Sequence, residues 1–256
     1  MSNITVFLDN IAISRDRPAL IAPSEGLELT YGEILSRISR TALVLTDQGV
    51  GKGDRVCIYL DSCPEHLISY FAIWRIGAVA VPANISLKED EIGYVIRDSG
   101  ARILIHDNSG ASVAMGALTK GDLACRGLNL DQLNASILDT GIYPPVNCSF
   151  DDLCQIQYTA GTTGNPKGAM LTQGNWLTSL ETEREVLALH ENDRYLGIYP
   201  MGHVGVSWGL SVLRAGGTYV IMKRFNLPEY LDLCRKYRIS ILSGMPPVIH
   251  SLCSAP

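Results

Sequence analysis

The chain has 256 residues, of which 46% are apolar and 18% are charged, a composition that predicts a folded globular protein and excludes a disordered one. Its formal net charge of -5 supplies no positive field for a nucleic-acid backbone and argues against a nucleic-acid partner. The seven cysteines include no C-x-x-C pair and the N-terminus does not resemble a signal peptide, so we expect a cytoplasmic protein without a disulfide framework. The longest apolar stretch, 67–83, contains Arg75 and Pro82, which disfavours a transmembrane segment.

The first part of the chain alternates short apolar runs with longer amphipathic ones, the pattern of β-α-β units around a largely parallel sheet. The expected elements are strands at 55–60, 78–82 and 102–105, helices at 66–76 and between Ser86 and Gly100, and a weak helix near 111–120. Ser62 with Glu65 has the spacing of a capping box at the first of these helices. Ser86 with Glu89 has the same spacing at the second, which Gly100 is expected to end.

The periodicity fades between about 108 and 149 and then resumes. The elements expected after it are strands at 153–158, 195–199, 218–222 and 239–242, helices at 175–189, 205–214 and 228–237, and a helix starting at Pro246. The sequence therefore predicts an α/β fold of largely parallel sheets flanked by helices, with a first subdomain at 1–150 and a second at 151–256. The chain stops at Pro256 without a terminating strand, so we expect the second subdomain to be incomplete there.

The segment 158–168, YTAGTTGNPKG, follows a predicted strand and is the strongest chemical signal in the chain. Its glycines allow backbone N–H groups to approach an anion, its threonines add neutral donors or a magnesium ligand, and Lys167 adds a positive charge. This combination predicts a site for the phosphates of a nucleoside triphosphate. It is not a Walker A loop, because Lys167 lies between Pro166 and Gly168 and no hydroxyl follows it, so a P-loop kinase or ATPase is disfavoured.

The same segment resembles the phosphate-loop signature of the acyl-adenylate-forming (AMP-binding) superfamily, in which Ser is commoner at the position of Ala160. Segments throughout the chain are similar to other parts of that family, at 14–21, 29–33, 49–56, 77–84, 170–175 and 200–205. The resemblance implies the N-terminal part of the adenylate-forming fold, with the C-terminal domain absent. Within this family, the sequence most resembles acyl-CoA synthetases that act on fatty or aryl acids.

The resemblance also implies roles for individual residues. The residues expected to bind the phosphates of ATP are Thr159, Ala160, Gly161, Thr162, Thr163, Gly164, Pro166, Lys167 and Gly168. Lys167 would neutralise charge during catalysis, and the Thr162 hydroxyl would face Mg²⁺. His203 lies in a segment that resembles P-x-x-H-x-x-G, which implies a catalytic position beside the carboxylate substrate, although a histidine among apolar residues is otherwise more often a core residue.

The implied function is that of an ATP-dependent ligase that activates a carboxylic acid as acyl-AMP and transfers it to CoA. The family's Tyr-Gly-x-Thr-Glu and Thr-Gly-Asp motifs and the catalytic lysine of its C-terminal domain have no counterpart before Pro256. We therefore expect the chain alone to be largely inactive in adenylation. Two alternatives stay open: an adenylation domain that loads a carrier protein, and a non-catalytic nucleotide-binding or interaction module. The acid and the oligomeric state are not determined by the sequence.

Overall fold

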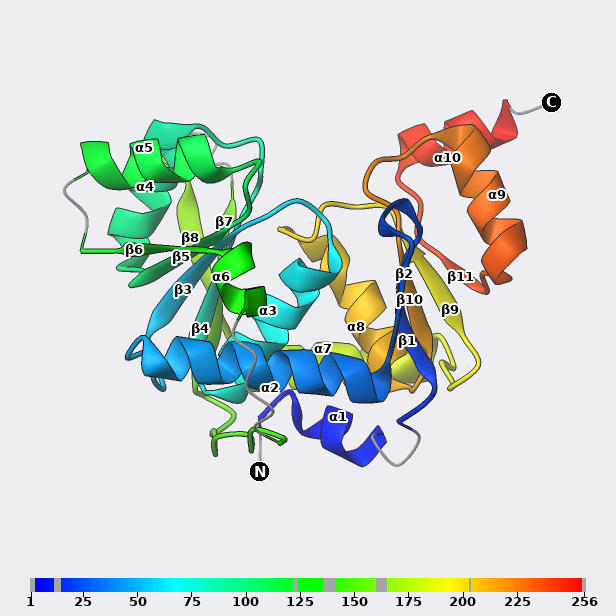
Figure 1. Cartoon of the computed structure of the whole chain (residues 1–256). Helices are drawn as coiled ribbons and strands as arrows, with labels where there is room; N and C mark the ends of the chain where they lie inside the picture. The colour runs from blue at the N-terminus through cyan, green and yellow to red at the C-terminus, as the bar shows by residue number, and fades with distance from the viewer. Residues whose placement is uncertain are drawn as a thin grey trace.

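The computed structural model describes residues 3–11, 15–121, 124–135, 141–159, 165–202 and 204–254, and its strands form two sheets (Figure 1). The six-stranded sheet has the order β6 (Arg126–Asn129), β5 (Ile103–His106), β3 (Arg55–Tyr59), β4 (Val79–Ala83), β7 (Leu153–Thr159) and β8 (Lys167–Thr172). The five-stranded sheet has the order β11 (Ile241–Leu242), β9 (Arg194–Gly197), β10 (Thr218–Ile221), β1 (Pro18–Ala22) and β2 (Leu27–Thr30).

Strand pairing is parallel except in two hairpins, β1–β2 and β7–β8. The prediction of largely parallel sheets in an α/β fold is thus confirmed. Each sheet takes strands from both sides of residue 150, because β1 and β2 join β9 to β11 while β7 and β8 join β3 to β6. The predicted subdomain division at that residue therefore does not coincide with a division between the sheets.

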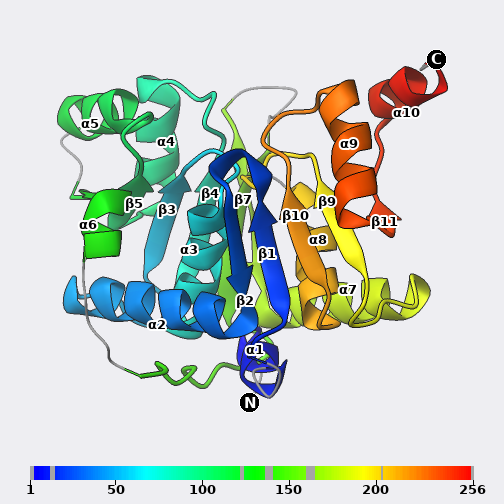
Figure 2. The same ribbon diagram turned by 45° about the vertical axis from the view of Figure 1, so that its right-hand side comes forward.

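The helices form layers on both sides of each sheet (Figures 1 and 2). They are α1 (Val6–Ile11), α2 (Tyr31–Asp47), α3 (Pro64–Arg75), α4 (Glu89–Ser99), α5 (Ala111–Lys120), α6 (Leu130–Ala135), α7 (Gln173–Val186), α8 (Ser207–Arg214), α9 (Leu227–Tyr237) and α10 (Pro246–Cys253), with 3₁₀ turns at Pro23–Glu25 and Val204–Val206. The largest apolar core joins α2, α3 and α8 to both sheets. A second core packs α4 and α5 on the six-stranded sheet, and a third packs α9 and α10 on the five-stranded one.

Several predicted elements are confirmed closely. The weak helix expected near 111–120 is α5, and Gly100 ends α4 in the left-handed conformation with a φ of 63°. Such a backbone angle suits glycine because it has no Cβ. Strands β1, β2, β6 and β8 and helices α1, α2 and α6 were not predicted. For α2, the missed signal was a true capping box in which Thr30 and Glu33 bond each other's backbone N–H.

Both predicted capping boxes were wrong. Helix α3 begins at Pro64 after Cys63, without a side-chain cap, and the Ser62 hydroxyl instead accepts the N–H of Met201. Glu65 forms an ion pair with Arg37. The spacing was thus present, but tertiary contacts engage both side chains.

At the second box, α4 begins at Glu89 after Lys88. Glu91, not Glu89, accepts the N–H of the preceding cap residue, at 2.8 Å. Glu89 points elsewhere, to an ion pair with Lys120 at 2.6 Å. The helix therefore starts two residues later than the Ser86 spacing predicted.

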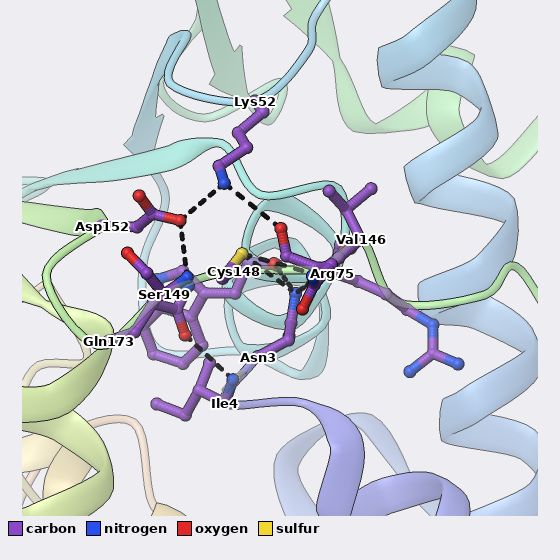
Figure 3. A network of polar contacts seen from close by, with 11 residues as sticks. Asn3, Ile4, Lys52, Arg75, Val146, Cys148, Ser149, Asp152 and Gln173 are labelled. Atoms are coloured by element: carbon purple, nitrogen blue, oxygen red, sulfur yellow. Dashed lines mark hydrogen bonds and ion pairs between the residues drawn. The ribbon is translucent and has the colours of Figure 1, made fainter. Parts of the chain in front are cut away.

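A buried set of polar contacts ties the start of the chain to the amino ends of β4 and β7, and we call it the N-terminal network (Figure 3). The Asn3 side-chain amide donates to the carbonyl oxygens of Trp74 at 2.8 Å and Val146 at 3.0 Å. The N–H of Ile4 donates to Gln173 Oε1 at 2.9 Å. The network packs the first residues of the chain against this end of the six-stranded sheet.

Two further findings bear on the sequence expectations. All seven cysteines are free thiols, and Cys154 is fully buried in β7, as expected for a small apolar side chain. Within the described ranges, no helix is long and apolar enough to cross a membrane.

Candidate active site

The predicted phosphate loop connects the two strands of the β7–β8 hairpin at the edge of the six-stranded sheet. Thr159 and Lys167 are directly paired across the hairpin, and Tyr158 pairs with Gly168 one position earlier. The connection therefore leaves the carboxyl end of β7 and returns along an antiparallel strand. In a sheet of parallel strands, ligands bind beyond the carboxyl ends, so Thr159 and Lys167, which flank the loop, lie at the side where a ligand is expected.

Part of the predicted site lies outside the described residues. These positions are Ala160, Gly161, Thr162, Thr163 and Gly164 in the loop, and His203. Of the predicted phosphate-binding set, the structure describes Thr159, Pro166, Lys167 and Gly168. Their predicted roles in binding stay predictions.

Lys167 begins β8 with an exposed side chain. Among the described residues, no carboxylate forms an ion pair with its ammonium group, in contrast to Lys52, Lys120 and Lys223. An ammonium at the end of a strand without an internal partner is available to an anion beyond that end. This placement fits the role predicted for Lys167 at a phosphate.

One face of the hairpin is anchored to α4. The Tyr94 hydroxyl donates to the carbonyl oxygen of Pro166 at 3.0 Å, and the Tyr158 hydroxyl donates to Asp98 Oδ2 at 2.6 Å. Burial and the nearby Asp98 carboxylate both raise the pKa of Tyr158, so it stays a neutral donor. These two bonds hold the strands on either side of the loop.

Gly168 is needed for this packing. A Cβ at that position would lie 2.6 Å from Ile156 Cγ2 and 3.3 Å from the ring of Tyr158. The glycine therefore lets β8 pair closely with β7 directly beside Lys167. Its described role is in packing, next to the predicted contact with phosphate.

The other face of the hairpin meets the segment 199–202, which leads to His203. Gln157 Nε2 donates to the carbonyl oxygen of Gly202 at 3.3 Å, and both residues are buried. A Cβ on Gly202 would lie 3.0 Å from the carbonyl oxygen of Ala83, at the carboxyl end of β4. The chain thus enters position 203 beside the carboxyl ends of β4 and β7, and we call this side of the six-stranded sheet the carboxyl edge.

Helix α3 holds the same segment from the opposite side. The Tyr70 hydroxyl donates to the carbonyl oxygen of Met201 at 3.2 Å, and the Met201 N–H donates to the Ser62 hydroxyl at 3.2 Å. Ser62, Tyr70 and Met201 are all buried. The backbone immediately before position 203 is therefore fixed by β7 on one side and by α3 on the other.

A small apolar pocket of about 220 Å³ lies between the end of β8, α7 and the start of α8. It is lined by Leu171, Asn175, Trp176, Ser179 and Ser207. The indole N–H of Trp176 donates to Gln155 Oε1 at 3.1 Å, so the ring is held by β7. Ser207 follows position 203 by four residues and Leu171 follows Lys167 by four, so the pocket is built from the continuations of both predicted site segments.

Comparisons with known proteins show which family the chain belongs to. The family model described as "AMP-binding enzyme" matches residues 7–256. The chain belongs to the AMP-binding enzyme family. This match spans nearly the whole chain and confirms the family that the phosphate-loop resemblance indicated.

Individual members of the family share both sequence and fold with the chain. It is 29% identical over 274 residues to the crotonobetaine/carnitine–CoA ligase of Salmonella heidelberg, a match that covers 99% of this chain and 53% of the relative. The N-terminal domain of FACL13 from Mycobacterium tuberculosis has a TM-score of 0.92 at 26% identity, covering all of this chain and 66% of the other. ATP-bound MatB from Rhodopseudomonas palustris has a TM-score of 0.88 at 28% identity, covering all of this chain and 51% of the other. The chain thus spans about half the length of the curated relatives it matches.

The sequence analysis missed the side chains that position the predicted segments. Gln155 and Gln157 are fully or nearly fully buried and project from the same face of β7. Their signal was available, since two glutamines two residues apart within an apolar strand must both face one side. Tyr94 gave no comparable signal, because its contact depends on the distant residue Pro166.

In the described parts of the chain, no group of three or more His, Cys, Asp or Glu side chains could hold an ion. Magnesium that accompanies a nucleotide is bound largely by phosphates and water with one or two protein ligands, so this family member does not need such a cage. The predicted ligand Thr162 lies outside the described residues.

Proposed function

We propose that this chain forms the N-terminal part of an ATP-dependent acyl-CoA synthetase that activates a carboxylic acid as its adenylate. A carboxylate oxygen would attack the α-phosphorus of ATP and release pyrophosphate, and the thiol of CoA would then take the acyl group and release AMP. The observation that carries the proposal is the meeting, at the carboxyl edge, of the hairpin bearing Lys167 and the segment entering position 203. Membership of the AMP-binding family supports it.

In this proposal the phosphate loop binds and orients ATP. The Lys167 ammonium and the backbone and hydroxyl donors around Thr159 would hold the pyrophosphate portion, with Ala160 to Gly164 completing the cradle. Reactions at phosphorus depend mainly on positioning and charge neutralisation, which a fixed hairpin can provide. Magnesium would supply further charge neutralisation when bound with ATP, with Thr162 as the proposed protein ligand.

The apolar pocket supports an acid with a compact apolar body. Its volume of about 220 Å³ lies below the roughly 300–1,000 Å³ typical of pockets for drug-sized ligands. Leu171 and Trp176 offer apolar surface, while Ser179 and Ser207 are small. We propose a fatty or aryl acid whose acyl group enters this pocket, with its carboxylate near His203.

Two alternatives differ in the acceptor or in activity. The acyl group could pass to a carrier protein in place of CoA, or the fold could serve as a nucleotide-binding module without catalysis. We further propose that residues 1–256 alone catalyse little adenylation, because the family's adenine-facing, ribose-binding and C-terminal lysine motifs have no counterpart in this sequence. The relatives are longer than the region that this chain matches, which is consistent with these motifs lying outside that region.

The test is ATP–pyrophosphate exchange over a panel of fatty and aryl acids, with residues 1–256 compared with the uninterrupted reading frame in which they are encoded. Acid-dependent exchange by the reading frame that falls with Lys167→Ala and His203→Ala would support the proposal, and subsequent thioester formation with CoA would separate it from carrier-protein loading. Exchange by residues 1–256 at the rate of a longer frame would contradict the proposed inactivity. Nucleotide binding without exchange for any acid would favour the non-catalytic module.

A further inference from the structure

A continuous chain of buried hydrogen bonds connects the wall of the apolar pocket to the segment before position 203. Trp176 Nε1 donates to Gln155 Oε1 at 3.1 Å, Gln155 Nε2 donates to Gln157 Oε1 at 3.0 Å, and Gln157 Nε2 donates to the Gly202 carbonyl oxygen at 3.3 Å. We call these three side chains and the Gly202 carbonyl the amide relay. Gln155 is fully buried, and Gln157 and Trp176 are 4% and 5% exposed.

The chemistry at its two ends gives the amide relay a single orientation. An indole N–H can only donate, so Gln155 must turn its oxygen toward Trp176. A backbone carbonyl can only accept, so Gln157 must turn its NH₂ group toward Gly202. The middle bond then has the donor and acceptor it needs, and flipping either amide would break two bonds at once. Buried polar groups left unpaired are costly, so the relay resists rearrangement.

The amide relay contacts the three parts of the site whose relative positions would align the acid with ATP. Trp176 lines the pocket of about 220 Å³, Gln157 precedes the hairpin residue Thr159 by two positions, and Gly202 directly precedes position 203. The Met201 bonds to Ser62 and Tyr70 fix the neighbouring backbone but reach neither the pocket nor the hairpin. Of the hydrogen bonds described for this segment, the Gln157 bond alone joins it to the strand that carries the phosphate loop.

We infer that Gln155 and Gln157 are positioning residues that set the depth and orientation of the acyl pocket relative to the phosphate loop, and thereby the acid that is aligned for adenylation. The inference rests on the proposed function and deepens it. Strand β7 fixes the origin of both glutamines, the relay fixes the pocket wall at Trp176, and the same relay fixes the entry to position 203. An acid would react well only when its acyl group reaches the wall while its carboxylate reaches the nucleotide.

The experiment compares Gln157→Met and Gln155→Met with the matched control Gln173→Met, in the uninterrupted reading frame that contains this chain. Methionine keeps the length of the side chain but removes its amide. Gln173 is equally buried, and its oxygen accepts the Ile4 N–H in the N-terminal network, so it forms none of the bonds of the relay. ATP–pyrophosphate exchange is measured for the preferred acid and for homologues one methylene shorter and longer, together with the melting temperature.

Loss of positioning should lower kcat/KM for the preferred acid by about 10- to 100-fold in both relay variants and flatten the preference among homologues, with the KM for ATP nearly unchanged. Gln173→Met should lower the melting temperature without changing the preference. Trp176→Phe keeps the ring but removes the indole N–H, and it should flatten the preference more weakly; it serves as the test should a methionine variant fail to fold.

The outcomes separate the two proposals. Unchanged preference and rate in the relay variants, with an active wild type, would overturn the positioning role and leave the proposed function intact. Equal loss in Gln173→Met would overturn it too, because general destabilisation would then explain the effect. A wild type that exchanges pyrophosphate with no acid would overturn the proposed function and this inference together.

Discussion

The outermost polar groups at the two ends of the parallel strands in the six-stranded sheet differ in exposure and in pairing. At the amino ends of β4 and β7, the N-terminal network pairs Asn3 and Ile4 with protein groups, and its contacts are largely buried (Figure 3). At the carboxyl edge, Lys167 and Thr159 are exposed, and Lys167 has no ion-pair partner in the described part of the chain. Because ligands of parallel α/β sheets bind beyond the carboxyl ends of the strands, we expect the amino end to contribute stability and the carboxyl edge to bind a ligand.

The largest expected effect is on activity at the carboxyl edge. Lys167→Ala should lower the exchange activity of the uninterrupted reading frame by about 10²- to 10³-fold, equivalent to about 3–4 kcal/mol of transition-state stabilisation. Unfolding by urea should be almost unchanged, because the exposed side chain supports no described contact of the fold. A large loss of stability with intact exchange would reverse the assignment of the two ends.

Arg75 provides the opposite case at the amino end. Its guanidinium is fully buried, forms an ion pair with Asp9 at 2.6 Å and donates to the carbonyl oxygen of Tyr143. Arg75→Met should reduce the free energy of unfolding by about 3 kcal/mol, because the carbonyl loses its partner and Asp9 loses its counter-charge. Asp9 is itself 31% exposed, so water can compensate part of that loss.

The measurement for Arg75→Met is a urea titration, with Arg37→Met as the control. Arg37 also forms an ion pair on a helix, but its side chain is 30% exposed. The control should therefore be much closer to wild type. Equal destabilisation by the two variants would show that the burial of Arg75 does not increase its contribution to the free energy of unfolding.

The sequence predicted those parts of the molecule whose signals are local. Helix α5 and the left-handed Gly100 follow from periodicity and turn chemistry within about ten residues, and the confirmed family was indicated most strongly by one short segment, 158–168. Besides its local hairpin with β2, strand β1 pairs with β10, with Leu20 opposite Tyr219, across most of the chain. No local pattern specifies such a partner.

The same limit applies at the candidate site. The segments around Lys167 and position 203 could be named from sequence, but their meeting through Gln157 and Gly202 depends on how β7 and the 199–202 segment pack. The hairpin was missed because β8 is an edge strand with mostly exposed or half-exposed residues, including Met170 at 71%, so it lacks the alternation of a buried strand. Candidate residues were therefore easier to predict than the contacts that position them.

His66 permits a pH test of the packing beneath the carboxyl edge. The ring is fully buried, stacks on Tyr70, and its Nδ1 lies 3.2 Å from the carbonyl oxygen of Asp61, while Nε2 has no partner in the described structure. Burial lowers the pKa of His66 to about 4. Because the folded pKa lies below the unfolded one, the unfolded state binds the proton first as pH falls, and stability is lost from about pH 6.5 down to about pH 4.

The expected contribution of His66 is a loss of about 2 kcal/mol between pH 7 and pH 5. His66→Phe keeps a ring against Tyr70 but cannot titrate, so the difference in unfolding free energy between wild type and variant should change by that amount across this range. Urea titrations of both proteins at several pH values measure it, and the carboxylates cancel in the difference. A difference that stays constant with pH would contradict the buried neutral histidine.

The smallest expected effect concerns the ion pair at the rim of the N-terminal network, between Lys52 and Asp152 (Figure 3). The hydrogen bond to the Asp152 carboxylate raises the pKa of Lys52, and the Lys52 ammonium lowers the pKa of Asp152. The ion pair is therefore present between the two titrations and is lost as pH falls through the lowered pKa of Asp152.

Lys52 is solvated, so Lys52→Met should reduce stability only weakly, and added salt should remove that effect. Asp152→Ala should be the more harmful variant, because Asp152 Oδ2 also accepts the Ser149 N–H at 2.8 Å. Urea midpoints measured at low and at high salt separate the ion pair from the hydrogen bond to Ser149. The part of the Asp152→Ala effect that remains at high salt comes from the turn at Ser149. Equal effects of both variants at high salt would show that this turn does not depend on the Asp152 carboxylate.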